Sequence, residues 1–548
     1  MANVTTVQTI VALQATATPA GAVTQLSKAG REGNFMWKAG NFTAQAASDP
    51  LMGIYVPSTV TAITSGCWVR EWDGITGRPE WFGAIADSSA GTVPADNYAA
   101  IQACIALCPI TQLGLASYYV NDTVWVNKDY RTLQGTLFGI EGPLPQGTQL
   151  IQTNNTKDVV RVGGTSTSDR RRIVRVRDIC ARWATDPVAP ASGTDTDRLA
   201  CPKAFHFMHC LVFQAYCCVA VDALIGHAFF DNINSQSVQP GCTRTRSLGA
   251  HDFMIGMWPY GSAAETGFAG ANASLYIRDA NVTMSGELQT VLDKATGLYA
   301  TKDFADLYVD GFETSQVNFG IRLDGAGWTY AGGHGDVHLR RLVFDQCKGN
   351  GIEIHNTNSY AKIHIDQFYI QIVSTGDKSN NGIQFLGGSG FATVANGQIV
   401  GGSGNQSIGI WLQNYPTVNV TDSVIIEAIG YPVNALNTNG LRISPLIGDG
   451  VNNSGGTRPA VSLTGVVESH VDPTIYGQSS SWARGIALEG SANARITVDP
   501  TRVNAGGISS GRKLMVNGTQ ITAPGYYKSN GTSGAASDNG VSVVGFPG

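Results

Sequence analysis

Apolar and polar residues alternate along much of the chain in runs short enough to be β-strands. In the stretch GIEIHNTNSYAKIHIDQFYIQIV, residues 351–373, isoleucine and aromatic side chains occupy every second position on either side of a polar turn. Such alternation is typical of strands with one buried face. Helical apolar spacing marks residues 95–108, ADNYAAIQACIALC, where Asp96 is a candidate helix cap.

Two series of strand patterns repeat along the chain. The first begins with glycine and an apolar residue: GLYAT at 297, GIRLD at 320, GIEIH at 351, GIQFL at 382 and GIWLQ at 409. Between them lie DLYVDGF at 306, DVHLRRLVF at 336, KIHIDQFYI at 362, FATVANGQI at 391 and TVNVTDSVI at 417. Members of the second series contain two strands joined at a corner such as Asp310-Gly311 or Asn396-Gly397.

Three short strands per repeat, with no helix between them, predict a solenoid built as a parallel β-helix. Its stacked coils should bury Ile321, Ile352, Ile383 and Ile410 in one column at a spacing of about 4.8 Å. The full prediction is an all-β, right-handed, single-stranded parallel β-helix with a small N-terminal β-domain and a small C-terminal β cap.

The same pattern predicts four segments. Residues 1–80 form an N-terminal attachment or β module, and 81–115 form a lead-in strand and a capping helix. Residues 116–475 form the parallel β-helix, and 476–548 form a C-terminal cap or trimerisation region. The irregular stretch at 239–270 is expected to consist of loops that build binding walls.

Charge and cysteine content narrow the possible partners. Lys and Arg total 36 against 41 Asp and Glu, a net charge of −5, which predicts no nucleic-acid or anionic-membrane surface. No signal peptide or long apolar run indicates membrane insertion. The 10 cysteines have no clamp-like spacing, so we expect core residues of a protein made in a reducing compartment, with no zinc site, other metal or cofactor.

Residues 28–135 resemble a known family, and the repeat pattern extends the resemblance to about residue 475. PEWFGAIAD, ADNYAAIQACIALCP and YYVNDTVWVNKDYRTLQG are similar to the opening segment of pectate-lyase-like β-helix proteins. AGREGNFMWKAGNF, GIYVP and GCWVREWDG resemble the N-terminal module of bacteriophage tailspikes and prophage-encoded depolymerases. One turn departs from the family pattern, since ADSSAGTVPADN replaces the usual GDGxTDD.

The resemblance implies a homotrimer that binds and cleaves a bacterial surface polysaccharide such as capsule, exopolysaccharide or O-antigen. It also implies attachment to a virion tail through the N-terminal module. Such a protein is made in the host cytoplasm and acts outside, at the bacterial surface. Because one fold supports many functions, a site must be argued from its residues.

The glycine-initiated strands predict two outward-facing columns. One column reads Tyr299, Arg322, Glu353, Gln384 and Trp411, and the other reads Thr301, Asp324, His355, Leu386 and Gln413. In these columns Arg322 should face Glu353, and Asp324 should face His355. The first function that this arrangement can serve is structural, as a ladder of charge pairs worth about 0.2–1 kcal/mol each.

The second function is catalysis on a glycosidic bond. The backbones at Glu353 and Asp324 should lie about 7–8 Å apart on neighbouring coils. Inverting glycosidases hold their carboxyl groups about 6.5–9.5 Å apart and retaining ones about 5–5.5 Å, and flexible side chains could reach either separation. Arg322 should keep Glu353 ionised as a general base, while the acid's proton could reside on Asp324 or His355. Tyr299 and Trp411 could stack on sugar rings, and Arg322 and Gln384 could bind the substrate.

Two further groups of residues are candidates for binding. Tyr308, His338 and His364 form one predicted column of the corner strands, beside a second column of Asp310, Arg340 and Asp366. These residues could serve the corners themselves or a site shared between subunits. A predicted loop, HDFMIGMWPYG, offers His251, Asp252, Trp258 and Tyr260, with the carboxylates of Glu265, Glu287 and Asp293 nearby in sequence.

Three functions follow from these residues. The favoured one is hydrolysis by the Glu353–Asp324 pair. The second is a polysaccharide lyase acting on a uronic-acid polymer, in which Arg322 would neutralise the sugar carboxylate and His355 or Tyr299 would be the base. The third is a glycan-binding adhesin or structural spike without catalysis.

Overall fold

The structure is a computed structural model of the chain. It describes residues 4–18, 21–86, 95–139, 146–188, 195–244, 254–260, 273–284, 295–301, 306–324, 335–373, 380–401, 407–427, 430–448, 459–476, 482–489, 496–499, 502–503, 508–516, 519–521, 526–529 and 541–544. The chain divides into two compact units. Unit 1 comprises Met1–Ala228 and Ser235–Cys242, and unit 2 comprises Phe229–Asn234 and Thr243–Gly548.

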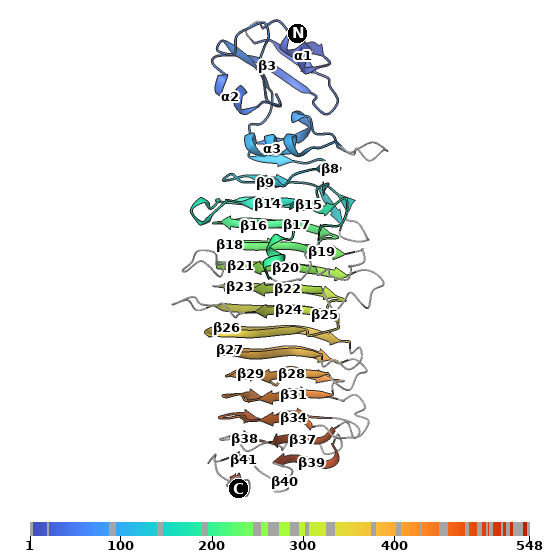
Figure 1. Cartoon of the computed structure of the whole chain (residues 1–548), viewed down its shortest axis with the longest axis vertical. Helices are drawn as coiled ribbons and strands as arrows, with labels where there is room; N and C mark the ends of the chain where they lie inside the picture. The colour runs from blue at the N-terminus through green and yellow to red at the C-terminus, as the bar shows by residue number, and fades with distance from the viewer. Residues whose placement is uncertain are drawn as a thin grey trace. The chain divides into compact units, whose positions relative to one another are not determined.

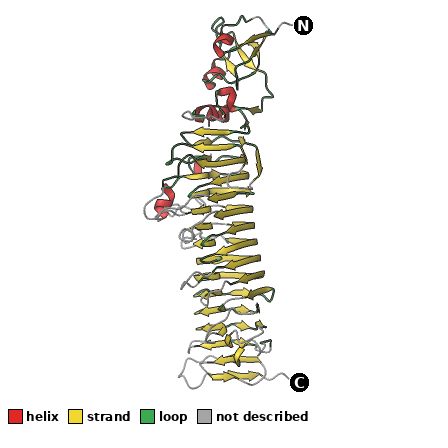
Figure 2. Ribbon diagram, turned by 90° about the vertical axis from the view of Figure 1, so that its right-hand side faces the viewer, coloured by secondary structure: helices red, strands yellow, loops and turns green. Residues whose placement is uncertain are grey.

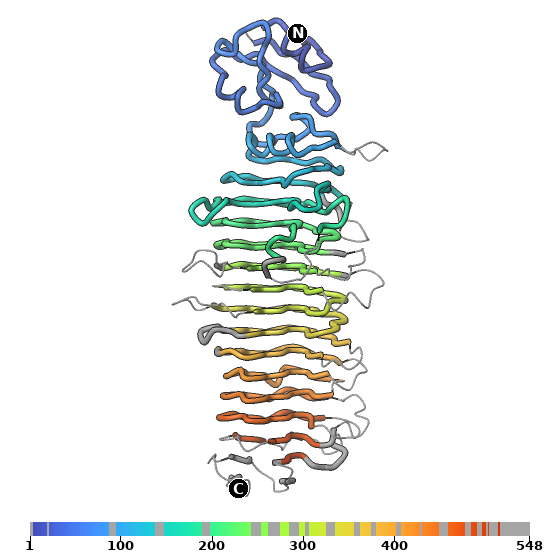
Figure 3. The backbone as a smooth tube through the Cα atoms, in the orientation of Figure 1, coloured from blue at the N-terminus to red at the C-terminus, as the bar shows by residue number. Residues whose placement is uncertain are grey.

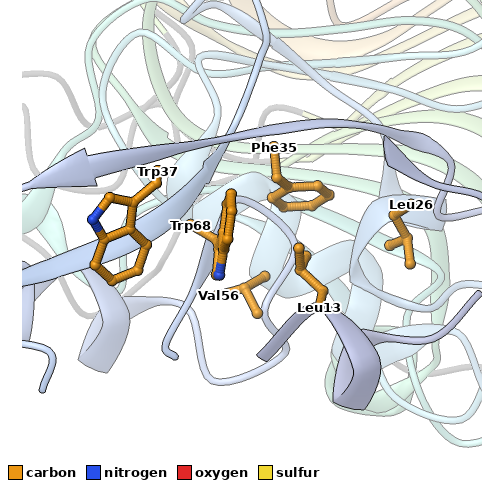
Figure 4. Packing of buried hydrophobic residues seen from close by; sticks show 6 residues of the cluster. All are labelled: Leu13, Leu26, Phe35, Trp37, Val56 and Trp68. Carbon is orange, nitrogen blue, oxygen red and sulfur yellow. The ribbon is translucent and has the colours of Figure 1, made fainter. Parts of the chain in front are cut away.

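Unit 1 begins with a five-stranded sheet in the order β1-β2-β3-β5-β4. Its elements are β1 (Thr5–Val7), α1 (Ile10–Gln14), β2 (Val23–Leu26), β3 (Gly33–Ala39), α2 (Thr43–Ser48), β4 (Tyr55–Val56) and β5 (Gly66–Arg70). Trp37 and Trp68 meet edge to face at 5.5 Å, in a core completed by Leu13, Phe35 and Val56 (Figure 4). The short aromatic strands expected near the N-terminus therefore form one sheet with its own core.

A lead-in segment follows the sheet: β6 (Thr76–Gly77), η1 (Pro79–Phe82), α3 (Tyr98–Leu107) and β7 (Ile110–Gln112). Helix α3 confirms the expected helical segment, and it buries Ile101, Cys104 and Ile105. Asn97, rather than Asp96, occupies the cap position. The Asp96 carboxylate nevertheless accepts the Tyr98 N–H, at 3.1 Å.

The next elements, up to residue 244, are mostly strands that pair in parallel, and one pair, Leu137–Gly139 with Gln146–Gly147, is antiparallel. They comprise β8 (Ser117–Val120), β9 (Val124–Val126), β10 (Thr132–Gln134), β11 (Leu137–Gly139), β12 (Gln146–Gly147), β13 (Gln149–Gln152), β14 (Val160–Gly163), η2 (Thr167–Asp169), β15 (Val174–Trp183), α4 (Asp195–Ala200), β16 (Lys203–Cys210), β17 (Phe213–Val221), β18 (Ile225–Val238) and β19 (Gly241–Arg244). The basic stretch at 169–177 enters β15, where Val174 and Val176 are buried and Arg175 and Arg177 are exposed. Its arginines thus form a charged outer face of the strand.

Unit 2 continues as stacked parallel strands (Figures 1 and 2). These are β20 (Met254–Tyr260), β21 (Ala273–Met284), β22 (Ala295–Thr301), β23 (Asp306–Ser315), β24 (Phe319–Asp324), β25 (Asp336–Cys347), β26 (Ile352–Ile372), β27 (Asn381–Val400), β28 (Ile408–Gln413), β29 (Val418–Val420), β30 (Val424–Glu427), β31 (Tyr431–Leu436), β32 (Arg442–Ile443), β33 (Leu446–Ile447), β34 (Pro459–Thr464), β35 (His470–Val471), β36 (Thr474–Ile475), β37 (Trp482–Glu489), β38 (Thr497–Val498), β39 (Ile508–Val516), β40 (Thr519–Ile521), β41 (Tyr526–Ser529) and β42 (Val541–Val544). The predicted parallel β-helix is confirmed.

The core of unit 2 is a set of in-register apolar columns. Ile321 pairs with Ile352, Ile352 with Ile383, and Ile383 with Ile410, as predicted. All four side chains are fully buried. Each backbone hydrogen bond between coils therefore also aligns apolar side chains for packing.

Parallel pairing extends beyond the expected end of the solenoid near residue 475. Strand β37 pairs in parallel with β34 and then with β39. The pairing becomes antiparallel only in β38–β41, β39–β40 and β41–β42. The change in pairing direction marks a different architecture at the end of the chain.

The corners between strands are built by a column of residues in the left-handed backbone region. Asp279, Gly311, Arg341, Gln367 and Asn396 have φ between 50° and 75°. They occupy equivalent positions in β21, β23, β25, β26 and β27. A left-handed residue turns the backbone sharply between two extended strands, which confirms the corners expected at Asp310-Gly311 and Asn396-Gly397.

The cysteines lie mostly in the core. None forms a disulfide, and all except Cys217 are buried. Burial raises the pKa of the Cys347 thiol to about 12, so this side chain stays protonated as a small apolar residue. Among the helices that the structure describes, none is long and apolar enough to cross a bilayer.

The backbone of unit 2 stacks coil on coil (Figure 3), and glycines recur at one position of successive coils. Gly297, Gly320, Gly351, Gly382 and Gly409 share one position, and a Cβ on any of them would lie 2.5–2.7 Å from a backbone oxygen of the next coil. Real Cβ atoms do not approach this closely, so any larger residue must push the coils apart. The recurrence of glycine is thus a steric requirement of stacking.

We expect Gly351→Ala to destabilise unit 2 by about 1–3 kcal/mol through overpacking. Its Cβ would meet Gly382 O at 2.7 Å and Ile370 Cγ2 at 2.5 Å. Chemical denaturation would measure the loss. Gly241→Ala is the matched control, because its Cβ would find Val219 at 3.4 Å, an ordinary contact. Equal stability of the two variants would contradict the steric account.

Candidate functional site

The outward columns of the glycine-initiated strands have the predicted register. Tyr299 pairs with Arg322, Arg322 with Glu353, Glu353 with Gln384, and Gln384 with Trp411. The second column pairs Thr301, Asp324, His355, Leu386 and Gln413 in the same way. Strands β22, β24, β26, β27 and β28 thereby gather the candidate residues on one face.

Glu353 is the centre of this face. Its side chain is only 8% exposed, although it points outward from the coil. Oε1 accepts a hydrogen bond from His355 Nε2 at 2.5 Å, and Oε2 accepts one from Asn350 Nδ2. Arg322 Nε lies 3.3 Å from Oε1, as an ion-pair contact rather than a well-directed hydrogen bond. The carboxylate is therefore surrounded by donors.

These contacts determine the charge of Glu353. Burial opposes ionisation, but the His355 hydrogen bond and the positive charge of Arg322 outweigh it. The net result holds the pKa of Glu353 below its usual value of 4.5. Glu353 is thus an ionised, buried carboxylate at neutral pH, as expected from its pairing with Arg322.

Asparagines behind the carboxylate were not predicted from the sequence. Asn350 donates to both Glu353 and Gln384, and its carbonyl accepts the Asn381 side-chain N–H at 2.9 Å. Asn381 also donates to Gln384 at 3.1 Å. Gln384, expected to bind substrate, is 6% exposed and serves this network. One feature of the sequence could have indicated these residues: an asparagine directly precedes the repeated glycine in KGNG and SNNG.

The predicted pairing of Asp324 with His355 is confirmed in register but not as a contact between the two side chains. The two residues are opposite each other in register, but His355 Nε2 contacts Glu353 on its own strand. No hydrogen bond or ion pair with a described residue reaches the Asp324 carboxylate, which is partly exposed. Glu353 and His355 are two residues apart on one strand, so their side chains lie on the same face. The buried, ionised carboxylate of Glu353 therefore accepts the hydrogen bond from His355.

Most of the aromatic side chains that were predicted to contact a sugar are buried. Trp258 and Tyr260 lie on strand β20 rather than on a loop, and they are 1% and 6% exposed. Tyr260 pairs with Thr301, so β20 is one more coil beneath the same face. Tyr299 is 6% exposed, with the Arg322 guanidinium 5.4 Å from its ring. These three rings have no open face for a sugar.

Trp411 differs from the other aromatic candidates. It is partly exposed at the far end of the same column. Its indole Nε1 is buried and makes no hydrogen bond with the described residues. A buried N–H without an acceptor is unusual, and a ligand oxygen could satisfy it. Trp411 remains a candidate for sugar contact.

Other predicted residues are not described. His251 and Asp252 lie just before β20, outside the described residues. Glu265, Glu287 and Asp293 lie in the segments on either side of β21, which are also outside the described residues. Across the described ranges, no three His, Cys, Asp or Glu side chains are placed to hold a metal ion.

The second candidate patch is a stacked ladder. The Tyr308 and His338 rings lie 5.0 Å apart, and the His338 and His364 rings 4.8 Å apart. Beside them, Asp310 accepts from Arg341 at 2.5 Å. Hydrogen bonding to Arg341 lowers the pKa of the Asp310 carboxyl.

The same patch contacts the corners at its other end. Asn396 donates to Asp366 at 2.8 Å, and Arg340 Nε reaches Gln367 Oε1 at 3.2 Å. Arg341, Gln367 and Asn396 are all left-handed corner residues. The polar residues of this patch therefore hold the corners, in line with the structural interpretation of their sequence pattern.

We predict that Arg322 and Glu353 are energetically coupled. Arg322→Gln leaves a buried carboxylate with one cation fewer and should destabilise the protein, whereas the same change in a Glu353→Gln background should cost less. A double-mutant cycle by chemical denaturation should give a coupling of roughly 0.5–3 kcal/mol. Additive effects would contradict the ion pair.

Comparison with known proteins identifies structural neighbours. No protein-family model matches the sequence, and no curated protein matches it. A double mutant of the tailspike of Escherichia coli bacteriophage HK620 aligns with a TM-score of 0.58 and 10% identity, over 87% of this chain and 84% of that one. An Asp→Asn mutant of that tailspike, solved with a pentasaccharide, gives a TM-score of 0.55 and 10% identity over 86% and 83%.

A longer tailspike aligns less well. Tailspike protein 2 of Escherichia coli O157:H7 bacteriophage CAB120 gives a TM-score of 0.34 and 12% identity, over 95% of this chain but only 57% of that one. This chain thus spans little more than half the length of that tailspike. At 10% identity, the alignment with the HK620 tailspike supports a shared fold and nothing further. The chain has the parallel β-helix fold of bacteriophage tailspikes.

Proposed function

We propose that the chain is a tailspike-type depolymerase that binds a bacterial surface polysaccharide and cleaves its glycosidic bonds internally by hydrolysis. The observation that carries this proposal is the state of Glu353. It is a buried carboxylate held ionised on an outward-facing column, with a second carboxylate, Asp324, on the neighbouring coil. Keeping a charge buried costs free energy, so an ionised carboxylate on an outward-facing column of the solenoid is a candidate for a catalytic role.

The two carboxylates have the unequal surroundings that hydrolysis requires. Glu353, ionised and fixed by Asn350 and His355, is the general base that activates a water molecule. Asp324, without such donors, is the candidate acid that protonates the leaving oxygen. The diagonal of about 7–8 Å between the backbones at these positions on adjacent coils leaves room for a water molecule, and it is compatible with either an inverting or a retaining hydrolase.

Structural neighbours of the chain bind oligosaccharides, which supports the proposed ligand class. The HK620 tailspike was solved with a pentasaccharide as an Asp→Asn mutant and with a hexasaccharide as a Glu→Gln mutant. Replacing a carboxylate by its amide preserves shape and removes the charge. By analogy, we infer an oligosaccharide-binding groove along the outward columns of this chain, with Arg322 and Trp411 among its contacts.

The Glu353–His355 hydrogen bond favours a second candidate, a polysaccharide lyase. With Glu353 ionised, His355 Nε2 must be the donor, which leaves Nδ1 as the nitrogen that could take a proton. Arg322, 31% exposed beside it, could neutralise the carboxylate of a uronic acid. Elimination creates a double bond that absorbs ultraviolet light, whereas hydrolysis does not. A chain that binds polymer without shortening it would be an adhesin.

We further propose that the chain works as a homotrimer on a virion tail, attached through the N-terminal sheet. The support is the resemblance of the first third of the sequence to tailspike modules. The separate core around Trp37 and Trp68 fits an independent attachment module.

We expect Glu353→Gln and Asp324→Asn each to reduce cleavage at least about 100-fold, because general acid and base groups contribute roughly 10²–10⁴. Reducing ends released from capsular and O-antigen polysaccharides would measure the loss. Glu313→Gln and Asp345→Asn, on another face of the same coils, are the matched controls. Full activity in both site variants would rule out this pair.

The pH dependence of cleavage should follow the ionisation of Glu353. Because the base must be ionised and the pKa of Glu353 is lowered from 4.5, the acid limb of kcat/KM should lie at that lowered pKa. Arg322→Gln removes a positive charge, so the acid limb of kcat/KM should move to higher pH. Arg442→Gln, an exposed arginine on β32, should leave the limb in place. An unmoved limb in Arg322→Gln would contradict the role of Glu353.

A further inference from the structure

Unit 1 contains a pocket that the proposed catalytic face does not use. Its volume is about 310 Å³, and it lies over three consecutive coils. Trp125 of β9, Arg161 of β14 and His206 of β16 are in register, so their side chains form one outward column across its floor. The pocket therefore has the same construction as the catalytic face, from different residues.

The floor of the pocket is a buried charge cluster centred on Asp158. Its carboxylate is 7% exposed and contacts Arg161 Nη2 at 2.9 Å and His206 Nδ1 at 3.0 Å. It also accepts the backbone N–H of Lys203 at 2.9 Å. These contacts fix Arg161 and His206 in place before any ligand arrives.

The walls add further cations and the aromatic rings of Tyr98 and Trp125. Lys203, 3% exposed, donates from Nζ to Leu199 O at 2.5 Å. At the rim, Lys157 lies 3.4 Å from Asp122 with both side chains nearly half exposed. Trp125 donates from Nε1 to Gly163 O at 3.0 Å, which holds its partly exposed ring at the edge of the pocket.

The charge of this lining is positive. Lys157, Arg161 and Lys203 carry three positive charges against the two negative charges of Asp122 and Asp158, a net of +1. Burial lowers the pKa of His206, which keeps its imidazole neutral at pH 7. A small anion would balance the excess charge in a partly water-excluded site.

Size and polarity define the ligand further. A volume of about 310 Å³ is at the lower end of the range for small-molecule sites, so it suits one compact ligand. The lining is mostly charged or polar, with the aromatic rings of Tyr98 and Trp125. That combination fits a polyhydroxylated ring with one anionic group better than an apolar molecule.

We propose that this pocket binds one acidic monosaccharide unit, with its carboxylate near Arg161 and its ring beside Trp125. The proposal does not depend on the catalytic role of Glu353, since no residue is shared between the two sites. The pocket would give the chain a second contact with glycan, and a polymer engaged at both places would bind more tightly through a higher effective concentration.

The test uses the full chain and sodium glucuronate as the probe, titrated by calorimetry and followed by saturation-transfer NMR. Glucose, which lacks the carboxylate, and acetate, which lacks the ring, are the matched ligands. We expect glucuronate to bind at least about tenfold more tightly than either, a difference that corresponds to one lost favourable interaction. Equal binding of acetate would reduce the pocket to a plain anion site and overturn the proposal.

Variants locate the bound sugar. Arg161→Gln should weaken glucuronate binding at least about tenfold, and the exposed rim change Lys157→Gln should weaken it by a smaller factor without affecting folding. Arg175→Gln, an exposed arginine of β15, should leave it unchanged. If Arg322→Gln abolishes binding while Lys157→Gln does not change it, the sugar binds elsewhere and the charge cluster only anchors residues 199–203.

Discussion

Hydrogen-bonded stacking of each coil on the next is the constraint on which the rest of this structure depends. In parallel pairing, every residue has a counterpart directly above and below, at a separation of about 4.8 Å. Ile321, Ile352 and Ile383 become a continuous buried column for this reason. The glycine column shows how tight the stacking is, because no side chain fits between those backbones.

The same constraint concentrates charge on the outer face. Residues that are far apart in sequence are brought into register whatever their charge, so Arg322 and Glu353 become neighbours across 31 residues of chain. A buried carboxylate there needs compensation, and Asn350 and His355 supply it. In unit 1, Asp158 has a comparable role between Arg161 and His206. Both sites combine an aromatic ring, an arginine and an acid on stacked coils.

Much of the fold could be predicted from the sequence, because period and alternation determine which side chains stack and which face inward. The register of the Glu353 column follows from the spacing of the glycines alone. The spacing does not determine which side chains contact each other. His355 could contact Asp324 on the neighbouring coil or Glu353 on its own strand, and the backbone geometry allows both contacts. Trp258 was assigned to a loop because its flanking sequence lacks the repeat, yet it lies in a coil.

The pocket in unit 1 was also beyond prediction, for a physical reason. Asp158 and Lys203 are 45 positions apart, and nothing in either local sequence marks a buried charge.

The spacing of the glycines has a consequence for how such a chain can change. The intervals between them vary from 23 to 31 residues, while the register of the paired strands is preserved. Inserting one residue within a strand would turn every later side chain in it to the opposite face. Length can therefore be added or removed only between strands. New specificities could arise by exchanging those connecting segments as cassettes, with the stacked frame inherited intact.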